Sequence, residues 1–576
     1  MRVLVDEPAI DKAFDYLVPA SLGDQVRVGD RVRVALGPRR VGGWVVQVGV
    51  EPPPGVNLKP LARWSGRGPG PDLIALAGWA AWRWAGRPAS FLRTASPGRV
   101  VTGLPAPFPP VAARPPGRGT AGPDHPVAAL AAEGLRRPVS LLRLGPATDP
   151  APAAVAAAAR GHALVLCPTA VLADHVARRL RAAGVAVAAH PGDWAQGAAG
   201  ATVVGTRAAA WAPVGGLAAV VVVDEHDESH QQEQAPTWHA RDVAVERARR
   251  AGVPCLLTSP CPSLEALGAA PVLAPPRGVE RDGWPVVDVV DMRGEDPRTG
   301  LLPPRLVRWL RSDRRVLCVL NRTGRARLLA CRACGELARC ERCGAAVGQT
   351  AGGALACGRC DLERPVVCAG CGAARLAVVR PGVTRVRDEI EALVGEPVAE
   401  VTGASGPPGG ARVVVGTEAT LHQVRRADVV AFLDLDQELL APRYRAAEQA
   451  MALVARAARA VGGRRRGGRL VLQTHVPDHE VVQAAVHGTP TGVEAAERAR
   501  RQLLRLPPVT AMAELSGEAA PAFVEALGAP AGVEVIGPSR GRWLVRADGH
   551  GALCGALAAV PRPPGRLRVA VDPLRV

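Results

Sequence analysis

The feature that most constrains this chain is a run of four Cys-x2-Cys pairs with the spacing C-x2-C-x5-C-x2-C-x13-C-x2-C-x7-C-x2-C. The eight cysteines are Cys331, Cys334, Cys340, Cys343, Cys357, Cys360, Cys368 and Cys371. Eight thiolates supply the ligands of two tetrahedral four-sulfur sites, a geometry that Zn2+ accepts without redox chemistry. The sequence therefore predicts two zinc ions, each held by four cysteines.

Paired cysteines also occur in disulfide frameworks and in iron–sulfur clusters. The chain shows no export signal, and cytosolic thiols stay reduced, so a disulfide framework is disfavoured. A segment as short as 331–371 buries too little apolar surface to fold alone, so each metal must contribute on the order of 10 kcal/mol. Four sulfurs leave no open coordination position, which predicts structural rather than catalytic ions. Spacing alone does not determine which pairs share a metal.

Arginine supplies nearly all of the positive charge. The chain has 71 basic and 53 acidic residues, a formal net charge of +18, and its only lysines are Lys12 and Lys59. This excess fits a polyanionic partner such as nucleic acid, although solvated surface arginine is the simpler alternative. No apolar run approaches the length of about 18 residues that a membrane span needs. We expect a cytoplasmic, nucleoid-associated protein without a membrane partner.

Two small units are predicted ahead of a linker. Residues 27–48 alternate between apolar and polar around a turn at Gly37, as in a half-buried antiparallel sheet, and we assign 1–68 to a small β domain. Residues 69–102 are helical and rich in tryptophan, and are small enough for a winged helix. Residues 103–126 are rich in Pro and Gly, which predicts a linker.

Beyond the linker, short apolar runs alternate with amphipathic helices, which is typical of parallel sheets with helices on their faces. The alternation stops at the cysteines and resumes after them. We therefore predict one α/β lobe at 127–275 and a second at 276–476, the second interrupted by the zinc-binding insert 331–371. Residues 477–576 are assigned to a separate α+β domain at the C-terminus.

The whole sequence resembles the replication-restart helicase family of primosomal protein N′ (PriA). The matching segments are KAFDYLVPASL, RVRVALGPRRVGGWVV, VVGTRAAAWAP, VVVVDEHDESHQQEQAPTWHARDVAVERA, PSLEAL, RAAEQAMALVARAARA, GRLVLQT, LLRLPP and a final VDP. The cysteine spacing is the most specific element. The resemblance implies a multidomain α/β protein with two RecA-like helicase lobes, a two-zinc insert, an N-terminal small β domain with a winged helix, and a C-terminal α+β domain.

The resemblance also implies how the cysteines are shared. The outer pairs, Cys331/Cys334 and Cys368/Cys371, would form one zinc site. The inner pairs, Cys340/Cys343 and Cys357/Cys360, would form the other.

A DNA-binding pocket is a further implication of the resemblance. Phe14, Asp15, Tyr16, Gly37 and Lys59 match residues that take the last nucleotide of a nascent 3′ strand. An aromatic ring can stack on the terminal base, and a carboxylate can accept a hydrogen bond from a free 3′-OH but repels a 3′-phosphate. The alternative is that both aromatic residues belong to the core and that Asp15 caps a turn, because the segment alternates as a packed strand does.

The nucleotide-binding motifs of the family are eroded in this chain. A P-loop needs glycines that wrap the phosphates, a lysine and a Ser or Thr hydroxyl, but the matching segment LLRLGPATDPAPAA retains only Gly145, and no lysine follows Lys59. The acidic motif has become Asp224–His226 preceded by valine, and Ala460 and Gly463 stand where the family has arginines. We expect ATP hydrolysis to be lost, and ATP is doubtful as a cofactor.

The leading hypothesis is a replication restart protein that binds abandoned or stalled forks, recognising branched DNA, nascent 3′ ends and single strands. It would promote primosome assembly and reloading of the replicative helicase without unwinding DNA. The implied protein partners are primosome proteins, the replicative helicase and its loader, and single-stranded-DNA-binding protein. The alternatives are an active ATP-dependent 3′–5′ DNA helicase of the primosome and a zinc-ribbon nucleic-acid-binding module.

Overall fold

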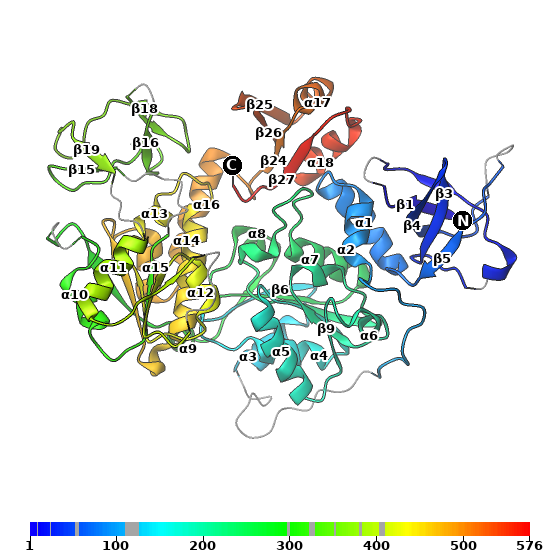
Figure 1. The fold of residues 1–576 in the computed structure, drawn as a ribbon, viewed down its shortest axis with the longest axis horizontal. Coiled ribbons are helices and arrows are strands. Elements are labelled where there is room, and N and C mark those ends of the chain that lie inside the picture. The colour runs from blue at the N-terminus through cyan, green and yellow to red at the C-terminus, as the bar shows by residue number, and fades with distance from the viewer. Residues whose placement is uncertain are drawn as a thin grey trace.

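The computed structural model consists of an N-terminal sheet, two central α/β lobes, a cysteine insert and a C-terminal domain (Figure 1). It describes residues 1–7, 10–23, 25–51, 57–109, 126–296, 300–321, 329–350, 353–378, 383–402 and 409–575. Most of the predicted linker 103–126 lies outside these residues. Within them, no helix has both the length and the apolarity needed to cross a membrane. The domain boundaries given above stay predictions.

The N-terminal sheet is antiparallel, with strand order β2-β1-β4-β3-β5. Its strands are β1 (Arg2–Val5), β2 (Ala13–Asp15), β3 (Arg31–Leu36), β4 (Arg39–Gln47) and β5 (Arg63–Gly66). Val32 and Val34 are buried while Arg33 between them is exposed, which is the predicted period of two. Gly37 turns the chain from β3 to β4 with a φ of +59°, a conformation that glycine adopts without strain.

Two helices, α1 (Pro71–Arg83) and α2 (Pro88–Ala95), join this sheet to the first lobe. The indole of Trp44 on β4 donates a hydrogen bond of 2.8 Å to Ser96 at the end of α2. On the other side, the ring of Phe91 lies 5.2 Å from that of Trp211 in the first lobe. These aromatic side chains are therefore packing residues between domains, while the winged-helix assignment of the segment stays a prediction.

The first lobe is a parallel sheet with strand order β12-β6-β11-β10-β7-β9-β8. Its strands are β6 (Val139–Arg143), β7 (His162–Leu166), β8 (Val187–Ala189), β9 (Thr202–Gly205), β10 (Leu217–Val222), β11 (Cys255–Ser259) and β12 (Val272–Leu273). Its helices are α3 (Pro126–Gly134), α4 (Ala151–Ala158), α5 (Ala170–Ala182), α6 (Trp194–Ala198), α7 (Ala240–Ala251) and α8 (Leu264–Ala269). Leu141 and Leu142 are adjacent on β6, but they belong to two different hydrophobic cores. The sheet is therefore covered on both faces.

The second lobe is also a parallel sheet, with strand order β13-β23-β22-β14-β21-β20. Its strands are β13 (Val286–Asp291), β14 (Val316–Val319), β20 (Ala399–Val401), β21 (Val413–Gly416), β22 (Val429–Phe432) and β23 (Arg469–Thr474). Its helices are α9 (Arg277–Asp282), α10 (Pro304–Leu310), α11 (Val383–Val394), α12 (Ala419–Gln423), α13 (Asp436–Leu439) and α14 (Ala446–Val461). Helices α15 (Glu480–His487) and α16 (Thr491–Leu504), in the range predicted for the C-terminal domain, add residues to the core of this lobe. Two parallel α/β lobes are the predicted fold class, which is thereby confirmed.

The sheets of the insert and of the C-terminal domain are antiparallel. The insert contains β15 (Leu329–Cys331), β16 (Val347–Gln349), β17 (Leu355–Cys357), β18 (Glu363–Arg364) and β19 (Leu376–Val378). The C-terminal domain contains β24 (Ala511–Ser516), β25 (Val533–Ser539), β26 (Arg542–Ala547), β27 (Arg568–Val571), α17 (Ala520–Leu527) and α18 (His550–Ala559). Short 3-10 helices are η1 (Ala20–Leu22), η2 (Arg207–Trp211), η3 (Glu228–His230) and η5 (Arg464–Arg466). Figure 1 places the insert beside the second lobe and the C-terminal domain near α1.

Candidate functional sites

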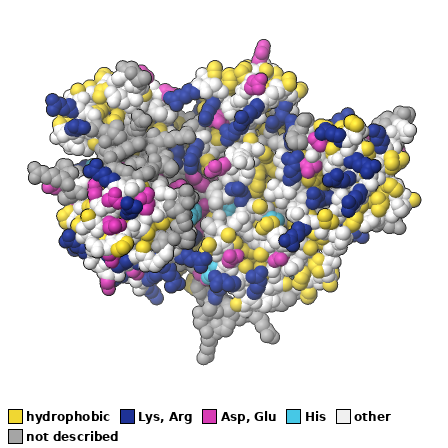
Figure 2. All heavy atoms as spheres, in the orientation of Figure 1, with side chains coloured by type: hydrophobic (Ala, Val, Ile, Leu, Met, Phe, Trp, Pro, Cys, Tyr) yellow, Lys and Arg dark blue, Asp and Glu magenta, His cyan; other side chains and the backbone are white. Residues whose placement is uncertain are grey.

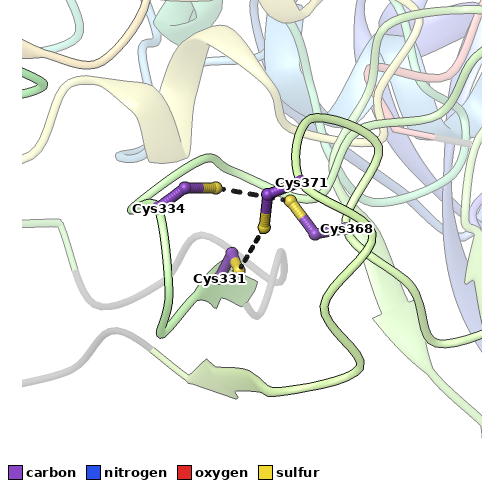
Figure 3. Close-up of side chains that lie close together, drawn as sticks. All are labelled: Cys331, Cys334, Cys368 and Cys371. Carbon is purple, nitrogen blue, oxygen red and sulfur yellow. Dashed lines mark hydrogen bonds between the residues drawn. The ribbon is translucent and has the colours of Figure 1, made fainter.

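The eight cysteines gather into two groups of four. In the outer group, the Sγ atoms of Cys331 and Cys371 are 3.5 Å apart, as are those of Cys334 and Cys368, and Figure 3 shows the four side chains converging. In the inner group, Cys340 lies 3.5 Å from Cys360, and Cys343 lies 3.4 Å from Cys357. Four zinc–sulfur bonds of about 2.3 Å need sulfurs within about 4 Å of one another, so both groups fit zinc. The predicted sharing of the pairs is confirmed.

Each Cys-x2-Cys pair lies in the same kind of backbone turn. The backbone N–H four residues after the first cysteine donates to that cysteine's carbonyl, at 2.9–3.0 Å in all four turns. The donors are Gly335, Gly344, Asp361 and Gly372, each with φ between +56° and +77°. Three of them are glycines because this left-handed conformation is strained for other residues, and Asp361 carries that strain in the third pair.

The two groups differ in exposure. Cys334 and Cys371 of the outer group are exposed, whereas no cysteine of the inner group is. The inner group is also fixed to the second lobe, because the Arg359 guanidinium donates to the carbonyls of Ala441 at 2.9 Å and Arg443 at 3.1 Å. The insert is thus held against the lobe through its inner site.

The segment that matches the P-loop is engaged by the chain itself. The N–H of Ala147, which lies where phosphate-binding amides would be, donates to the carbonyl of Gly283 at 3.0 Å. Gly145 packs so closely on the same segment that a side-chain carbon there would meet the Cα of Gly283 at 2.7 Å. Arg143 forms an ion pair of 2.7 Å with Glu280, whose side chain is buried. The room and the donors of a phosphate cradle are therefore used for packing between the lobes.

Two arginines of α14 in the second lobe reach carboxylates in and directly after the acidic motif of the first lobe. Arg456 donates to Asp227 at 2.7 Å, and Arg459 donates to both carboxylate oxygens of Asp224, one of them at 2.9 Å. Arg459 also donates to the carbonyl of Pro146 at 2.8 Å. We refer to the pairs Arg456–Asp227 and Arg459–Asp224 as the interlobe ion pairs.

The remaining carboxylate of the acidic motif is also occupied. Glu225 is fully buried and accepts hydrogen bonds from the backbone N–H and the hydroxyl of Ser263, at 2.8 and 2.7 Å, and from Arg241 at 3.1 Å. Both carboxylates of the acidic motif, Asp224 and Glu225, and the adjoining Asp227 are thus each satisfied by protein donors.

Charge keeps the interlobe ion pairs formed at neutral pH. Burial alone would raise the pKa of Asp224 and of Asp227, but the facing Arg459 and Arg456 charges lower both pKa values below their ordinary value. The sequence showed that arginines are missing at positions 460 and 463, but it did not reveal that Arg456 and Arg459 form the interlobe ion pairs. Their spacing of three residues, which places them on one face of a helix, was the available signal.

The residues of the predicted DNA pocket lie near one another but in different settings. Tyr16 is 4% exposed and donates its hydroxyl to the carbonyl of Ala35 at 2.9 Å, so its ring belongs to the core of the sheet. Phe14 is only partly buried, and the ammonium of Lys12 lies 5.9 Å from its ring centre. Of the two aromatic residues, Phe14 is the less buried.

The other residues of the predicted pocket are Asp15, Lys59 and Gly37. Asp15 pairs with Arg2 at 2.9 Å, and the hydrogen bond from Arg2 lowers the pKa of the Asp15 carboxyl. Lys59 is exposed, and its carbonyl accepts a hydrogen bond of 3.0 Å from Leu17, directly after Tyr16. Gly37 is exposed in the β3–β4 turn. The fold brings these residues to one part of the sheet, and their contact with DNA stays a prediction.

Comparisons with known proteins match these observations. A model of the 3′ DNA-binding domain (3′BD) of PriA matches residues 2–97. The probable replication restart protein PriA of Mycobacterium tuberculosis (strain CDC 1551 / Oshkosh) is 31% identical over 573 residues, which cover 90% of this chain and 86% of that protein.

Other relatives are matched over a smaller share. The replication restart protein PriA of Haemophilus influenzae is 28% identical over 357 residues, 57% of this chain and 48% of that protein, so the chain spans about half the length of this relative. Among solved structures, a DEAD box protein from Methanococcus jannaschii covers 66% of this chain and 89% of its own, with 11% identity and a TM-score of 0.31. A likeness this low supports no argument, and the fold class rests on the strand order of the two sheets.

Proposed function

This chain belongs to the replication restart protein PriA family, and we propose that it binds abandoned or stalled replication forks and promotes reloading of the replicative helicase without unwinding DNA. Branched DNA with a nascent 3′ end and adjoining single strands would be its nucleic-acid partners. Primosome proteins, the replicative helicase and its loader, and single-stranded-DNA-binding protein would be its protein partners. The site of action would be the nucleoid.

The observation that carries this proposal is the occupation of the motor cleft. A helicase converts nucleotide binding and release into movement of one lobe against the other. Here Arg459 pairs with Asp224 of the acidic motif and Arg456 pairs with the adjoining Asp227. The backbone N–H of Ala147 donates to the carbonyl of Gly283. The cleft that would open and close around ATP is joined by the protein's own side chains. The lobes then serve as a fixed platform for DNA and partner proteins.

Zinc has a structural part in this proposal. Four thiolates per ion leave no ligand position for water or substrate, so each ion would hold the insert in shape. The Arg359 contacts to Ala441 and Arg443 place that insert on the second lobe, where it offers a surface for partner proteins.

Recognition of the 3′ end gives the first test. A fork whose nascent strand ends in a 3′-phosphate should bind about tenfold more weakly than the same fork with a free 3′-OH, because the Asp15 carboxylate repels the added charge. D15N should lose most of this discrimination. The matched control D11N, which neutralises an exposed carboxylate in the same segment, should keep it. Fluorescence anisotropy with the two forks measures the ratio, and equal affinity of the wild-type protein for both forks would count against the pocket.

ATP turnover separates the proposal from the helicase alternative. Wild-type protein mixed with forked DNA, Mg2+ and ATP should release phosphate at the background rate. Turnover that rises with fork concentration would instead assign the chain to the ATP-driven helicases.

A further inference from the structure

Three arginines lie on one face of neighbouring strands in the N-terminal sheet. Arg33 on β3 is directly opposite Arg63 on β5, and it is opposite Gly42 on β4. Arg40, two residues before Gly42, is on the same face as a diagonal neighbour of Arg33. All three side chains are exposed. Among the described residues, none of the three forms an ion pair or a side-chain hydrogen bond. We call Arg33, Arg40 and Arg63 the arginine face.

Such an arrangement is unfavourable for the isolated sheet. Like charges directly opposite each other on neighbouring strands repel and destabilise the sheet. Three acids of this domain pair with arginines outside the face: Asp6 with Arg93, Asp30 with Arg67, and Asp15 with Arg2. Among the residues that the structure describes, no carboxylate forms an ion pair with the arginine face. Figure 2 shows basic side chains spread over the N-terminal domain with few acidic ones between them.

The shape of the face indicates which anion it fits. The arginines follow three adjacent strands about 4.8 Å apart, so they form an open charged band rather than a closed site for a small anion. Double-stranded DNA presents a regular line of charge, one per about 1.7 Å of helix axis, which an open band can follow. The hairpin that carries Arg33 and Arg40 also carries Gly37 of the predicted 3′-end pocket. Such a band can therefore continue from a bound strand end onto the adjoining duplex.

We propose that the arginine face binds the phosphate backbone of the duplex arm that adjoins the nascent 3′ end. This inference rests on the proposed function, since it assumes that a fork is the ligand. The contact reads no base sequence, because the guanidinium groups meet only phosphates. It positions the duplex so that the strand end reaches the pocket.

The test uses the full chain and a duplex capped by hairpins at both ends, which offers no 3′ end to the pocket. The double variant R33Q/R63Q should bind this probe about tenfold more weakly at physiological salt. The slope of log affinity against log salt concentration should fall by roughly two, because two phosphate contacts are lost. The single variant R40Q should lower the slope by about one. Fluorescence anisotropy over a salt series gives both quantities.

The control is R305Q/R308Q, which removes two exposed arginines from α10 in the second lobe. Binding of R33Q/R63Q that equals this control, or no binding of the capped duplex by wild-type protein, would overturn the inference. Removing facing like charges should leave the melting temperature equal or higher, so weaker binding would not reflect unfolding.

The two proposals fail in different ways. If R33Q/R63Q loses the capped duplex while wild-type protein ignores the state of the 3′ end on forks, the arginine face stands and the pocket fails. If R33Q/R63Q keeps full affinity for the capped duplex while forks are still discriminated by their 3′ ends, the arginine face fails and the pocket stands.

Discussion

Removal of zinc is expected to unfold the cysteine insert while both lobes stay folded. The described residues of the insert form a two-stranded sheet, a three-stranded sheet and one small core, which is too little to be stable in water. Metal binding is then the main source of its stability, on the order of 10 kcal/mol per site. Incubation with a strong chelator should release two zinc ions per chain. Hydrogen exchange should become fast in the insert and should stay slow in the strands of the lobes.

Single substitutions test whether the unfolding of the insert is caused by the loss of zinc. C340S removes one inner ligand and should leave about one zinc per chain. C554S is the matched control: Cys554 is a buried cysteine outside the insert whose thiol donates to the Arg83 carbonyl, and a serine hydroxyl can make the same bond. It should keep both ions. An insert that stays protected from exchange after complete metal removal would contradict the structural role of zinc.

The two ions should leave at different rates. Cys334 and Cys371 expose the outer site, whereas the inner site lies against the second lobe through Arg359. A chelator should therefore take the outer ion first, which gives two phases in a zinc-indicator trace. C371S should abolish the faster phase. A single phase in the wild-type protein would mean that both sites open together.

Replacing Arg459 with methionine should release the first lobe from the second. Asp224 keeps 5% of its side chain exposed, so losing its partner leaves a buried charge uncompensated. Because 36% of the Arg459 side chain is exposed, we expect the lower end of the usual range, about 3 kcal/mol. The distance between dyes on the two lobes, measured by energy transfer, should lengthen and become broadly distributed. Addition of ATP and Mg2+ should not restore it.

A double-mutant cycle isolates the ion pair. D224N removes the charge but keeps a residue type that tolerates the left-handed φ of +51° at this position. The double variant D224N/R459M should cost less than the sum of the single variants, because Asp224 no longer lacks a partner. The control R465M breaks an ion pair with Asp282 in which Arg465 is 90% exposed, and it should leave the lobes together. Lobes that stay closed in R459M would show that the Arg459–Asp224 pair is not needed to hold them together.

The interlobe ion pairs should also resist acid. Arg459 and Arg456 lower the pKa values of Asp224 and Asp227 below the ordinary value of 3.8, in spite of burial. A carboxyl with a lowered pKa stabilises the folded state at pH above its unfolded pKa, and loses that contribution as pH falls through its folded pKa. The dye distance in the wild-type protein should therefore stay constant from pH 7 to about pH 4 and lengthen only below it. Opening near pH 6 would indicate a histidine instead.

The cysteine spacing predicted two four-sulfur sites, but only the resemblance to the family implied which pairs share a metal. The two parallel lobes could also be predicted from the sequence, because buried strands in parallel sheets are short continuous apolar runs. The sequence predicted the DNA pocket only in part, because nothing in it distinguishes the burial of Phe14 from that of Tyr16. In the structure the Tyr16 hydroxyl donates to the carbonyl of Ala35 and its ring is buried. Which of two alternating aromatic residues faces solvent depends on what packs against each face.

By itself the sequence determined two four-cysteine metal sites, two α/β lobes and the loss of the P-loop lysine, because each of these depends on residue types at short, fixed separations. Only the tertiary structure decided what replaced the lost nucleotide chemistry. Arg459 and Asp224 are 235 residues apart in the chain, and no local pattern links them. They meet because two separate sheets place α14 of the second lobe over the strand ends of the first.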